Sequence, residues 1–147
     1  MIKKALALLS LSALAACGVR VDVGGIASGV TADPLTAAVT SDCMDVRGAK
    51  LLALDHALTR GGATVTALET KCAAYRSPTC SDTIPKELLS CTGASCDQYK
   101  PSVAISATRG WMHRFDVSGA AFAICTFTPT GTHASDTLTI VASPVME

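Results

Sequence analysis

The fold expected for this chain follows from residues 103–128, which read VAISATRGWMHRFDVSGAAFAICTFT. Apolar residues recur at every second position along much of this stretch, and this is the period of a strand that buries one face. Val103, Ile105 and Ala107 share a face of a first strand, which ends before Gly110. The stretch therefore begins with an expected strand and a short turn.

Three more strands are expected after that turn. The second strand covers residues 111–117, and the third, residues 120–128, is apolar on both faces, as a central strand should be. The inward row of the second strand is Trp111, His113, Phe115 and Val117. After a polar loop, residues 137–142 form a fourth strand with Leu138 and Ile140 inward. Because short turns join consecutive strands, we expect a four-stranded antiparallel meander.

Residues 45–60 show a helical pattern instead. Leu51, Leu54 and Leu58 recur at spacings of three and four and form one apolar stripe. The segment begins with an aspartate that suits an N-cap, and a Gly-Gly pair follows its last arginine. We expect this helix to cover one face of the meander. The predicted fold class is therefore α+β, a small disulfide-stabilised domain with an N-terminal helix packed on a C-terminal four-stranded antiparallel meander.

The middle of the chain is harder to assign. Residues 63–72 combine a strand-like start with helix-favouring residues, and we expect a strand at the start of that segment. Residues 77–101 contain Pro78, Pro85, Gly93 and Pro101, which predict a loop-rich segment. At most a short helix beginning at Pro85 is expected there.

The N-terminus has the three parts of a signal peptide. Lys3 and Lys4 form a positive head, residues 5–13 are an apolar run, and small residues follow. The apolar run is too short to cross ~30 Å of hydrocarbon as a permanent helix. We therefore predict that residues 1–16 are a signal peptide that is removed from the mature protein.

The end of this segment, Leu14-Ala15-Ala16-Cys17, resembles the lipobox of bacterial lipoproteins. The resemblance implies that Cys17 receives a diacylglyceryl group on its sulfur, becomes the first mature residue and carries palmitate-type acyl chains. Two or three chains make a stable membrane anchor, whereas one binds only marginally. Gly18 follows the anchor, and in this class a residue other than aspartate there favours the outer membrane. The alternatives are an ordinary secretory signal, cut near Ala15-Ala16, with an incidental Cys17, and an apolar helix of a cytosolic protein.

Residues 17–40 are expected to be the lipid anchor and a flexible tether, and residues 41–147 a globular disulfide-stabilised domain. The tether assignment rests on the density of glycine, because glycine weakens helices and strands. Residues 19–23 alternate well enough to be a short strand, which remains the other interpretation of that segment.

Charge argues against a nucleic-acid partner. Without Lys3 and Lys4 the chain has ten basic and twelve acidic residues, a net charge near −2, and no basic cluster. Aromatic residues are few, so the core must be built largely from small aliphatic side chains. Such a core buries little apolar area for each residue, and additional stabilisation is therefore expected.

Six cysteines remain once Cys17 is set aside, and an even number outside the cytoplasm predicts disulfide bonds. They are Cys43, Cys72, Cys80, Cys91, Cys96 and Cys125. Six cysteines allow 15 pairings, which sequence alone does not resolve. Our preferred set joins Cys72 to Cys80, Cys91 to Cys96 and Cys43 to Cys125. Three such bonds at ~2–4 kcal/mol each would decide whether the domain folds.

A zinc site formed by Cys91, Cys96 and a histidine such as His113 is the rival interpretation. Structural zinc sites usually show paired ligands at short spacings, and only one close cysteine pair exists here. We therefore expect no metal and no cofactor.

The histidines do not form a catalytic pattern. His113 is expected to be a half-buried core residue of its strand, and His56 to lie on the surface of the helix beside Asp55. His133 stands near Ser135 and Asp136, but three such residues close in sequence are not a triad, since a triad requires convergence in space. Glycine-rich phosphate loops are absent. We therefore expect no catalytic residue and no enzyme.

The helix expected at residues 45–60, followed by Gly62-Ala63 and a strand ending at Cys72, is similar to outer-membrane lipoproteins that sense envelope stress. The similarity implies a small disulfide-bonded α/β domain hung from a lipid, and no residue roles are carried over.

The sequence thus favours a lipid-anchored binding or structural lipoprotein. We expect it at the outer membrane, with its domain in the periplasm or at the cell surface, recognising a protein or envelope polymer. The alternative is an inhibitor, immunity or superinfection-exclusion lipoprotein encoded by a host, phage or plasmid.

Overall fold

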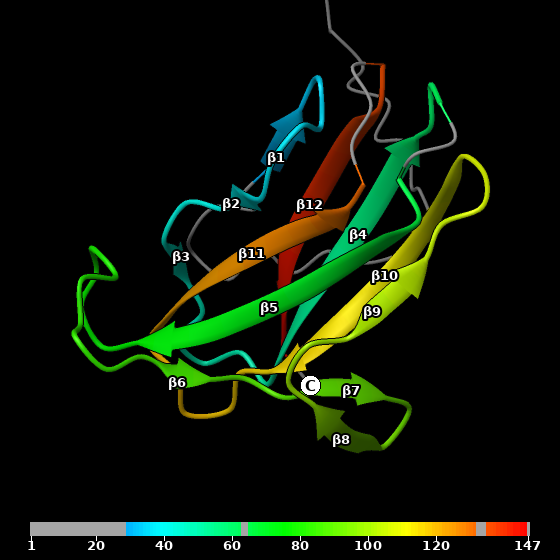
Figure 1. Cartoon of the computed structure of the whole chain (residues 1–147). Coiled ribbons are helices and arrows are strands. Elements are labelled where there is room, and N and C mark those ends of the chain that lie inside the picture. The colour runs from blue at the N-terminus through cyan, green and yellow to red at the C-terminus, as the bar shows by residue number, and fades with distance from the viewer. Residues whose placement is uncertain (1–28, 63–64, 132–134, 147) are drawn as a thin grey trace, which may run out of the picture.

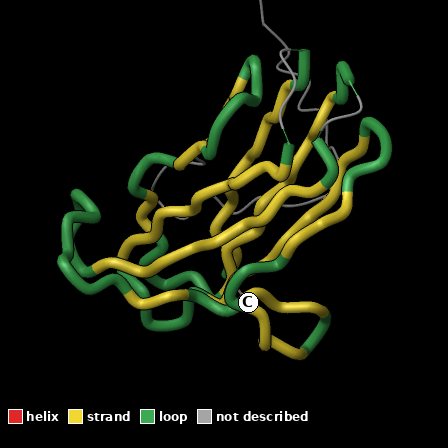
Figure 2. The backbone as a smooth tube through the Cα atoms, in the orientation of Figure 1, coloured by secondary structure: helices red, strands yellow, loops and turns green. Residues whose placement is uncertain are grey.

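The protein is built from strands and loops. The computed structural model describes residues 29–62, 65–131 and 135–146, and it contains no helix among them (Figures 1 and 2). The strands are β1 (Gly29–Ala32), β2 (Val39–Thr40), β3 (Met44–Asp45), β4 (Leu51–Thr59), β5 (Ala67–Tyr75), β6 (Lys86–Glu87), β7 (Ser90–Thr92), β8 (Ser95–Gln98), β9 (Ser102–Ala104), β10 (Arg109–Asp116), β11 (Phe122–Thr130) and β12 (Thr137–Val145). The α+β fold class predicted above is therefore wrong, and this part of the chain is all-β.

The strands form two antiparallel sheets that face one another (Figure 1). Sheet A has the order β1-β12-β4-β10-β7-β8, and sheet B has the order β2-β11-β5-β6, with β3 on β11 and β9 on β5. Each inner face is largely apolar, so the two faces bury one another. The arrangement is a β-sandwich.

The predicted meander is also wrong, although its four strands exist as β9 to β12. None of these four strands pairs with another of the four. β10 pairs with β4 in sheet A, β11 pairs with β5 in sheet B, and β12 returns to β4. The chain crosses between the sheets at each turn, because a two-sheet core buries both inner faces while a single meander without a covering helix would expose one.

The segment predicted as a helix over residues 45–60 forms β3, a turn and β4. The inward residues of β4 are Leu52, Leu54, His56 and Leu58, all buried. These positions have the period of two that defines a strand. The alternation was missed because one inward residue is a histidine. Leu51, which is not an inward residue, combined with Leu54 and Leu58 to give the spacing of a helical stripe. Asp45 accepts hydrogen bonds from Arg47 and caps no helix.

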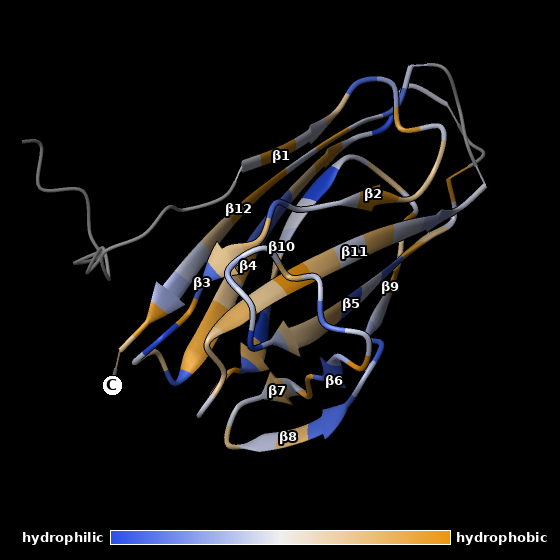
Figure 3. Cartoon of the chain, turned by 90° about the vertical axis from the view of Figure 1, so that its left-hand side faces the viewer, coloured by the Kyte–Doolittle hydropathy of each residue, from blue (hydrophilic) through white to orange (hydrophobic). Residues whose placement is uncertain are grey.

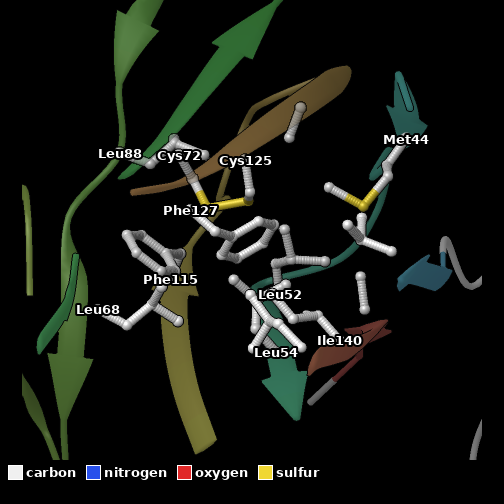
Figure 4. Close-up of a cluster of buried hydrophobic side chains, with 14 of the residues drawn as sticks. Met44, Leu52, Leu54, Leu68, Cys72, Leu88, Phe115, Cys125, Phe127 and Ile140 are labelled. Atoms are coloured by element: carbon white, nitrogen blue, oxygen red, sulfur yellow. A yellow bond between two sulfur atoms is a disulfide. The ribbon is translucent and has the colours of Figure 1, made fainter. Parts of the chain in front are cut away.

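The core lies between the sheets and contains side chains from both. Phe115 and Leu52 of sheet A, and Phe127 and Leu68 of sheet B, are fully buried (Figure 4). Figure 3 shows the corresponding hydrophobic stretches along β4, β11 and β12. The two phenylalanines supply bulk that the small aliphatic residues lack, and truncating either one to alanine removes about 3–5 kcal/mol of stability on the usual scale.

All six cysteines after Cys17 form disulfide bonds, as predicted. The bonds are Cys43–Cys80, Cys72–Cys125 and Cys91–Cys96. Of the preferred pairing only Cys91–Cys96 is correct. Cys72 and Cys125 are directly opposed residues of β5 and β11, with Cα atoms 4.1 Å apart, so this bond joins the two central strands of sheet B. Cys43–Cys80 ties the segment before β3 to the loop after β5.

The N-terminal segment divides into two parts. Residues 1–28, which include the signal peptide, Cys17 and the strand considered at residues 19–23, lie outside the described residues. Residues 29–40, assigned to the tether by sequence, contribute β1 and β2 and bury Val30 and Leu35. The part of the chain that the structure describes has no helix with the length and hydrophobicity that a membrane span requires.

Candidate functional site

A cleft of about 720 Å³ opens at one end of the sandwich. Its walls come from the end of β5, from the loop 76–85 with β6, and from the turn between β10 and β11. Among the lining residues, Leu88 is buried and Tyr99 is half exposed. The cleft is therefore an open depression lined by both polar and apolar residues, with an aromatic side chain available to a ligand.

The charged residues that line the cleft are of both signs. Asp82, Glu87 and Asp116 are acidic, and Arg76 and Lys86 are basic. Hydrogen bonds from the side chain and the backbone N–H of Ser118 hold the pKa of Asp116 below its usual value. The lining thus carries charges of both signs and is not a uniformly basic surface of the kind that binds nucleic acid.

A disulfide bond and a pair of hydrogen bonds constrain the backbone of loop 76–85. Cys80, in the left-handed region at φ 50°, is bonded to Cys43. The carboxylate of Asp82 accepts hydrogen bonds from the backbone N–H groups of Arg76 and Ser77. Ile84 extends from this loop with 89% of its surface exposed and lines the cleft. A constrained loop thus presents a large apolar side chain to solvent.

A second candidate site is a cluster of four aromatic and imidazole rings between the sheets. His56 stacks on Trp111 with ring centroids 4.8 Å apart, and it meets His113 and Phe127 edge-on at 5.0 and 5.6 Å. The first contact follows from register, because His56 and Trp111 are directly opposed on β4 and β10. His56 was predicted at the surface of a helix and is 97% buried, since only 3% of its surface is exposed.

The hydrogen bonds of His56 define its tautomer. Its Nδ1 lies 2.9 Å from the carbonyl oxygen of Leu54, and its Nε2 lies 3.3 Å from the hydroxyl of Thr70. A neutral ring that donates from Nδ1 and accepts at Nε2 satisfies both partners. Burial, with a further contribution from His113, lowers the pKa of His56 to about 4. The ring is therefore neutral at pH 7 and serves as a polar member of the core.

His113 lies half-buried on the inner face of β10, as predicted, and burial lowers its pKa. Its Nδ1 is buried with no hydrogen-bond partner, and the same holds for Nε1 of Trp111. The zinc site considered for Cys91, Cys96 and His113 is incompatible with this arrangement, because the two sulfur atoms are bonded to each other. Within the described ranges, no group of three or more His, Cys, Asp or Glu side chains is placed to hold a metal ion.

Of the residues grouped near His133, that histidine lies outside the described part of the chain. Asp136 is fully buried, and its Oδ1 accepts hydrogen bonds from the backbone N–H groups of Gly61 and Gly62 at 2.7 and 3.2 Å. The Gly-Gly pair predicted to end a helix is thus part of a turn fastened to the start of β12. Asp136 acts in the fold, holding that turn.

Sequence reasoning did not identify the cleft. Its residues come from segments between positions 74 and 121 that carry no motif. The available signals were the exposed apolar and aromatic residues in a cysteine-rich loop segment, Ile84 and Tyr99, which have no role in an alternating strand.

Comparisons with known proteins identify no family. No protein-family model matches the chain, and no curated protein does. Among solved structures, the SPBc2 prophage-derived protein YomS is similar with a TM-score of 0.42 and 15% identity, over 80% of this chain and 96% of that one. No enzyme family is indicated by these comparisons.

Proposed function

We propose that this protein is a lipid-anchored binding protein of the bacterial cell envelope. In this proposal Cys17 carries the lipid at the outer membrane, and the cleft at the end of the sandwich recognises a protein or an envelope polymer, with a polypeptide segment preferred. The mature domain thereby works at the surface where its partner resides. A tether raises the effective concentration of a binding site without requiring high intrinsic affinity.

The covalent framework supports the compartment. Three disulfide bonds indicate an oxidising, extracytoplasmic location, because bacterial cytoplasm keeps thiols reduced. The lipobox ending at Cys17 supports the anchor, and Gly18 supports the outer membrane as its destination.

The cleft carries the binding proposal. It combines a mixed polar and apolar lining, charges of both signs and two exposed large side chains, Ile84 and Tyr99. Aromatic and apolar side chains on a constrained surface are typical of recognition sites because few rotamers are lost on binding. The Cys43–Cys80 bond and the Asp82 hydrogen bonds hold one wall of the cleft in place before any partner arrives.

A photo-crosslinking amino acid at Tyr99 tests the binding proposal in living cells. We expect covalent capture of a small number of envelope components at this position. The matched control is the same amino acid at Thr139, which is exposed on the outer face of β12, away from the cleft. Absence of any adduct at Tyr99, or the same adducts at both positions, would contradict a recognition role for the cleft.

Intact-mass analysis of protein extracted from membranes tests the anchor. We expect a chain that begins at Cys17, heavier than its sequence by two or three acyl chains, and that gains two hydrogens for each disulfide bond on reduction. The Cys17→Ser variant should lose the acyl mass and leave the membrane fraction. An unmodified chain that begins at Met1 would refute the anchor.

One observation favours the alternative function, an inhibitor, immunity or superinfection-exclusion lipoprotein. The loop 76–85 presents Ile84 almost fully exposed on a backbone held by a disulfide bond, and this is a suitable shape for blocking another protein. Cells that express the protein would then resist an incoming phage or toxin, and Ile84→Asp would abolish the resistance while leaving expression unchanged. Equal sensitivity with and without the protein would exclude this function for the agents tested.

A further inference from the structure

Within the part of the chain that the structure describes, the edge of sheet A at β10 has an unfilled strand position. β10 pairs with β4 along its whole length, from Arg109 to Asp116. On its other side, β7 pairs only with Arg114 and Phe115. Among the described residues, positions 109–113 of β10 therefore have a neighbouring strand on one side only.

The direction of the free backbone groups follows from two hydrogen bonds. The N–H of Asp116 donates to Leu89 on the β7 side, and the N–H of Val117 donates to Lys50 on the β4 side. Backbone groups alternate sides along a strand, so even-numbered residues of β10 face the β7 side. Gly110 and Met112 therefore direct their N–H and C=O groups to the open edge.

β7 does not continue along this edge because its hairpin turns away. Gly93, at φ 64°, begins the turn between β7 and β8, and the Cys91–Cys96 bond clamps the two strands. The backbone N–H of Met112 has no bond to Gly93, its next partner in the register of β7. A gap is therefore left beside Met112, where a further residue pair between β10 and β7 would otherwise form.

A groove of about 380 Å³ occupies this gap. Its walls include Thr92 and Gly93 of the hairpin, Ser102 of β9, and Met112 and His113 of β10. The groove is therefore bounded by edges of both sheets. The side chain of His113, which lines this groove, has a buried Nδ1 without a hydrogen-bond partner.

The edge of β10 lacks the protection that the other long open strands carry. β12 is uncovered by β1 after Val141 and has Pro144 there, and β11 is uncovered by β2 after Phe127 and has Pro129 there. Proline blocks strand addition because it has no N–H. The open part of β10 contains no proline, and its edge residues are a glycine and a half-exposed methionine.

We propose that the open edge of β10 binds an extended acidic segment of a partner polypeptide, which adds to sheet A as a strand in line with β7. Backbone hydrogen bonds from Gly110 and Met112 supply the pairing, as in other cases of strand addition. Arg114 is the charged residue lining the groove, and no acidic residue lines it, so a carboxylate on the added strand is favoured. This surface is separate from the cleft, and the inference does not depend on the function proposed for the cleft.

A library of random 12-residue peptides, panned against the full disulfide-bonded protein, tests this proposal. We expect binders with alternating residues and at least one acidic position. Binding should slow hydrogen exchange at the N–H groups of Gly110 and Met112. The Met112→Pro variant, which removes one edge donor, should weaken these binders about tenfold. Met112→Ala is the matched control for loss of the side chain, and because it keeps the backbone N–H it should weaken these binders much less than Met112→Pro does.

Arg114→Glu provides a second test that does not perturb the backbone, since this side chain is exposed. It should weaken acidic binders about tenfold and enrich basic ones when panning is repeated. The proposal is overturned if no binder is selected, if binders are equally affected by Met112→Ala and Met112→Pro, or if Tyr99→Ala in the cleft abolishes binding while the β10 variants do not.

Discussion

Acidification between pH 7 and pH 4 should destabilise the sandwich through His56. This ring is buried between the sheets against Trp111, with both nitrogens used in a neutral tautomer. Protonation would place a charge at the centre of the core beside His113, and Nε2 would lose its role as an acceptor for Thr70. The folded protein therefore resists protonation of this residue.

The magnitude follows from the pKa in each state. In the folded protein the pKa of His56 is lowered from 6.5 to about 4. Well above pH 6.5 the ring is neutral in both states, and its titration then has no effect on stability. As the pH falls below 6.5 the unfolded chain binds the proton and the folded chain does not, so stability is lost until the pH reaches about 4. Linkage gives a loss of about 2 kcal/mol at pH 5 and about 3 kcal/mol at pH 4.

Urea unfolding at several pH values measures this loss. Trp111, the sole tryptophan of the chain, reports unfolding by its fluorescence. The control is His56→Gln, which removes the titrating group. This variant should be less stable than the wild type at pH 7. Between pH 7 and pH 5, however, its free energy of unfolding should fall by about 2 kcal/mol less than that of the wild type. His113, whose pKa is lowered by burial, and carboxylates such as Asp45 and Glu87, whose pKa values are lowered by Arg47 and Lys71, titrate in both proteins. Identical pH slopes in the two proteins, or a His56 NMR titration centred above pH 6, would refute the reasoning.

Two further perturbations test the framework of the fold. Asp136→Ala should lower the free energy of unfolding by about 2 kcal/mol, because two backbone N–H groups lose their acceptor; a change below about 0.5 kcal/mol in thermal unfolding would contradict this role. Replacing Cys72 and Cys125 by alanine should cost about 2 kcal/mol more than replacing Cys91 and Cys96, because the first bond spans 53 residues and the second spans 5. Urea unfolding of the two double variants makes this comparison, and equal losses would show that the loop entropy of the unfolded chain does not dominate.

The strands of the C-terminal half were predictable because their signal is local. Alternating residues such as Trp111, His113 and Phe115 indicate a strand whatever it pairs with, and the structure contains β10 at that position. β4 was mistaken for a helix because its inward row includes His56. A polar residue among buried apolar ones makes an alternation with a period of two hard to recognise in the sequence. The structure shows why this histidine is tolerated in the core, because its Nε2 lies within hydrogen-bond distance of the Thr70 hydroxyl.

The pairing of the strands was not predictable in the same way. β10 and β11 follow one another after a short turn, yet they belong to different sheets. The turn residues favour a hairpin locally, but the sandwich gains more by burying both inner faces than by pairing neighbours. The cleft and the open edge of β10 result from strand pairings between residues far apart in the sequence, so no local sequence pattern predicted either of them.

The sequence by itself determined where strands form in the C-terminal half and that six cysteines pair with one another, because alternation and an even cysteine count are properties of the chain alone. The tertiary structure decided which strands are neighbours, and with them the partners of the cysteines. Cys72 and Cys125 lie 53 positions apart in sequence and meet only because β5 pairs with β11. Contacts of this kind depend on how two apolar faces fit together, and that fit is a property of the whole core.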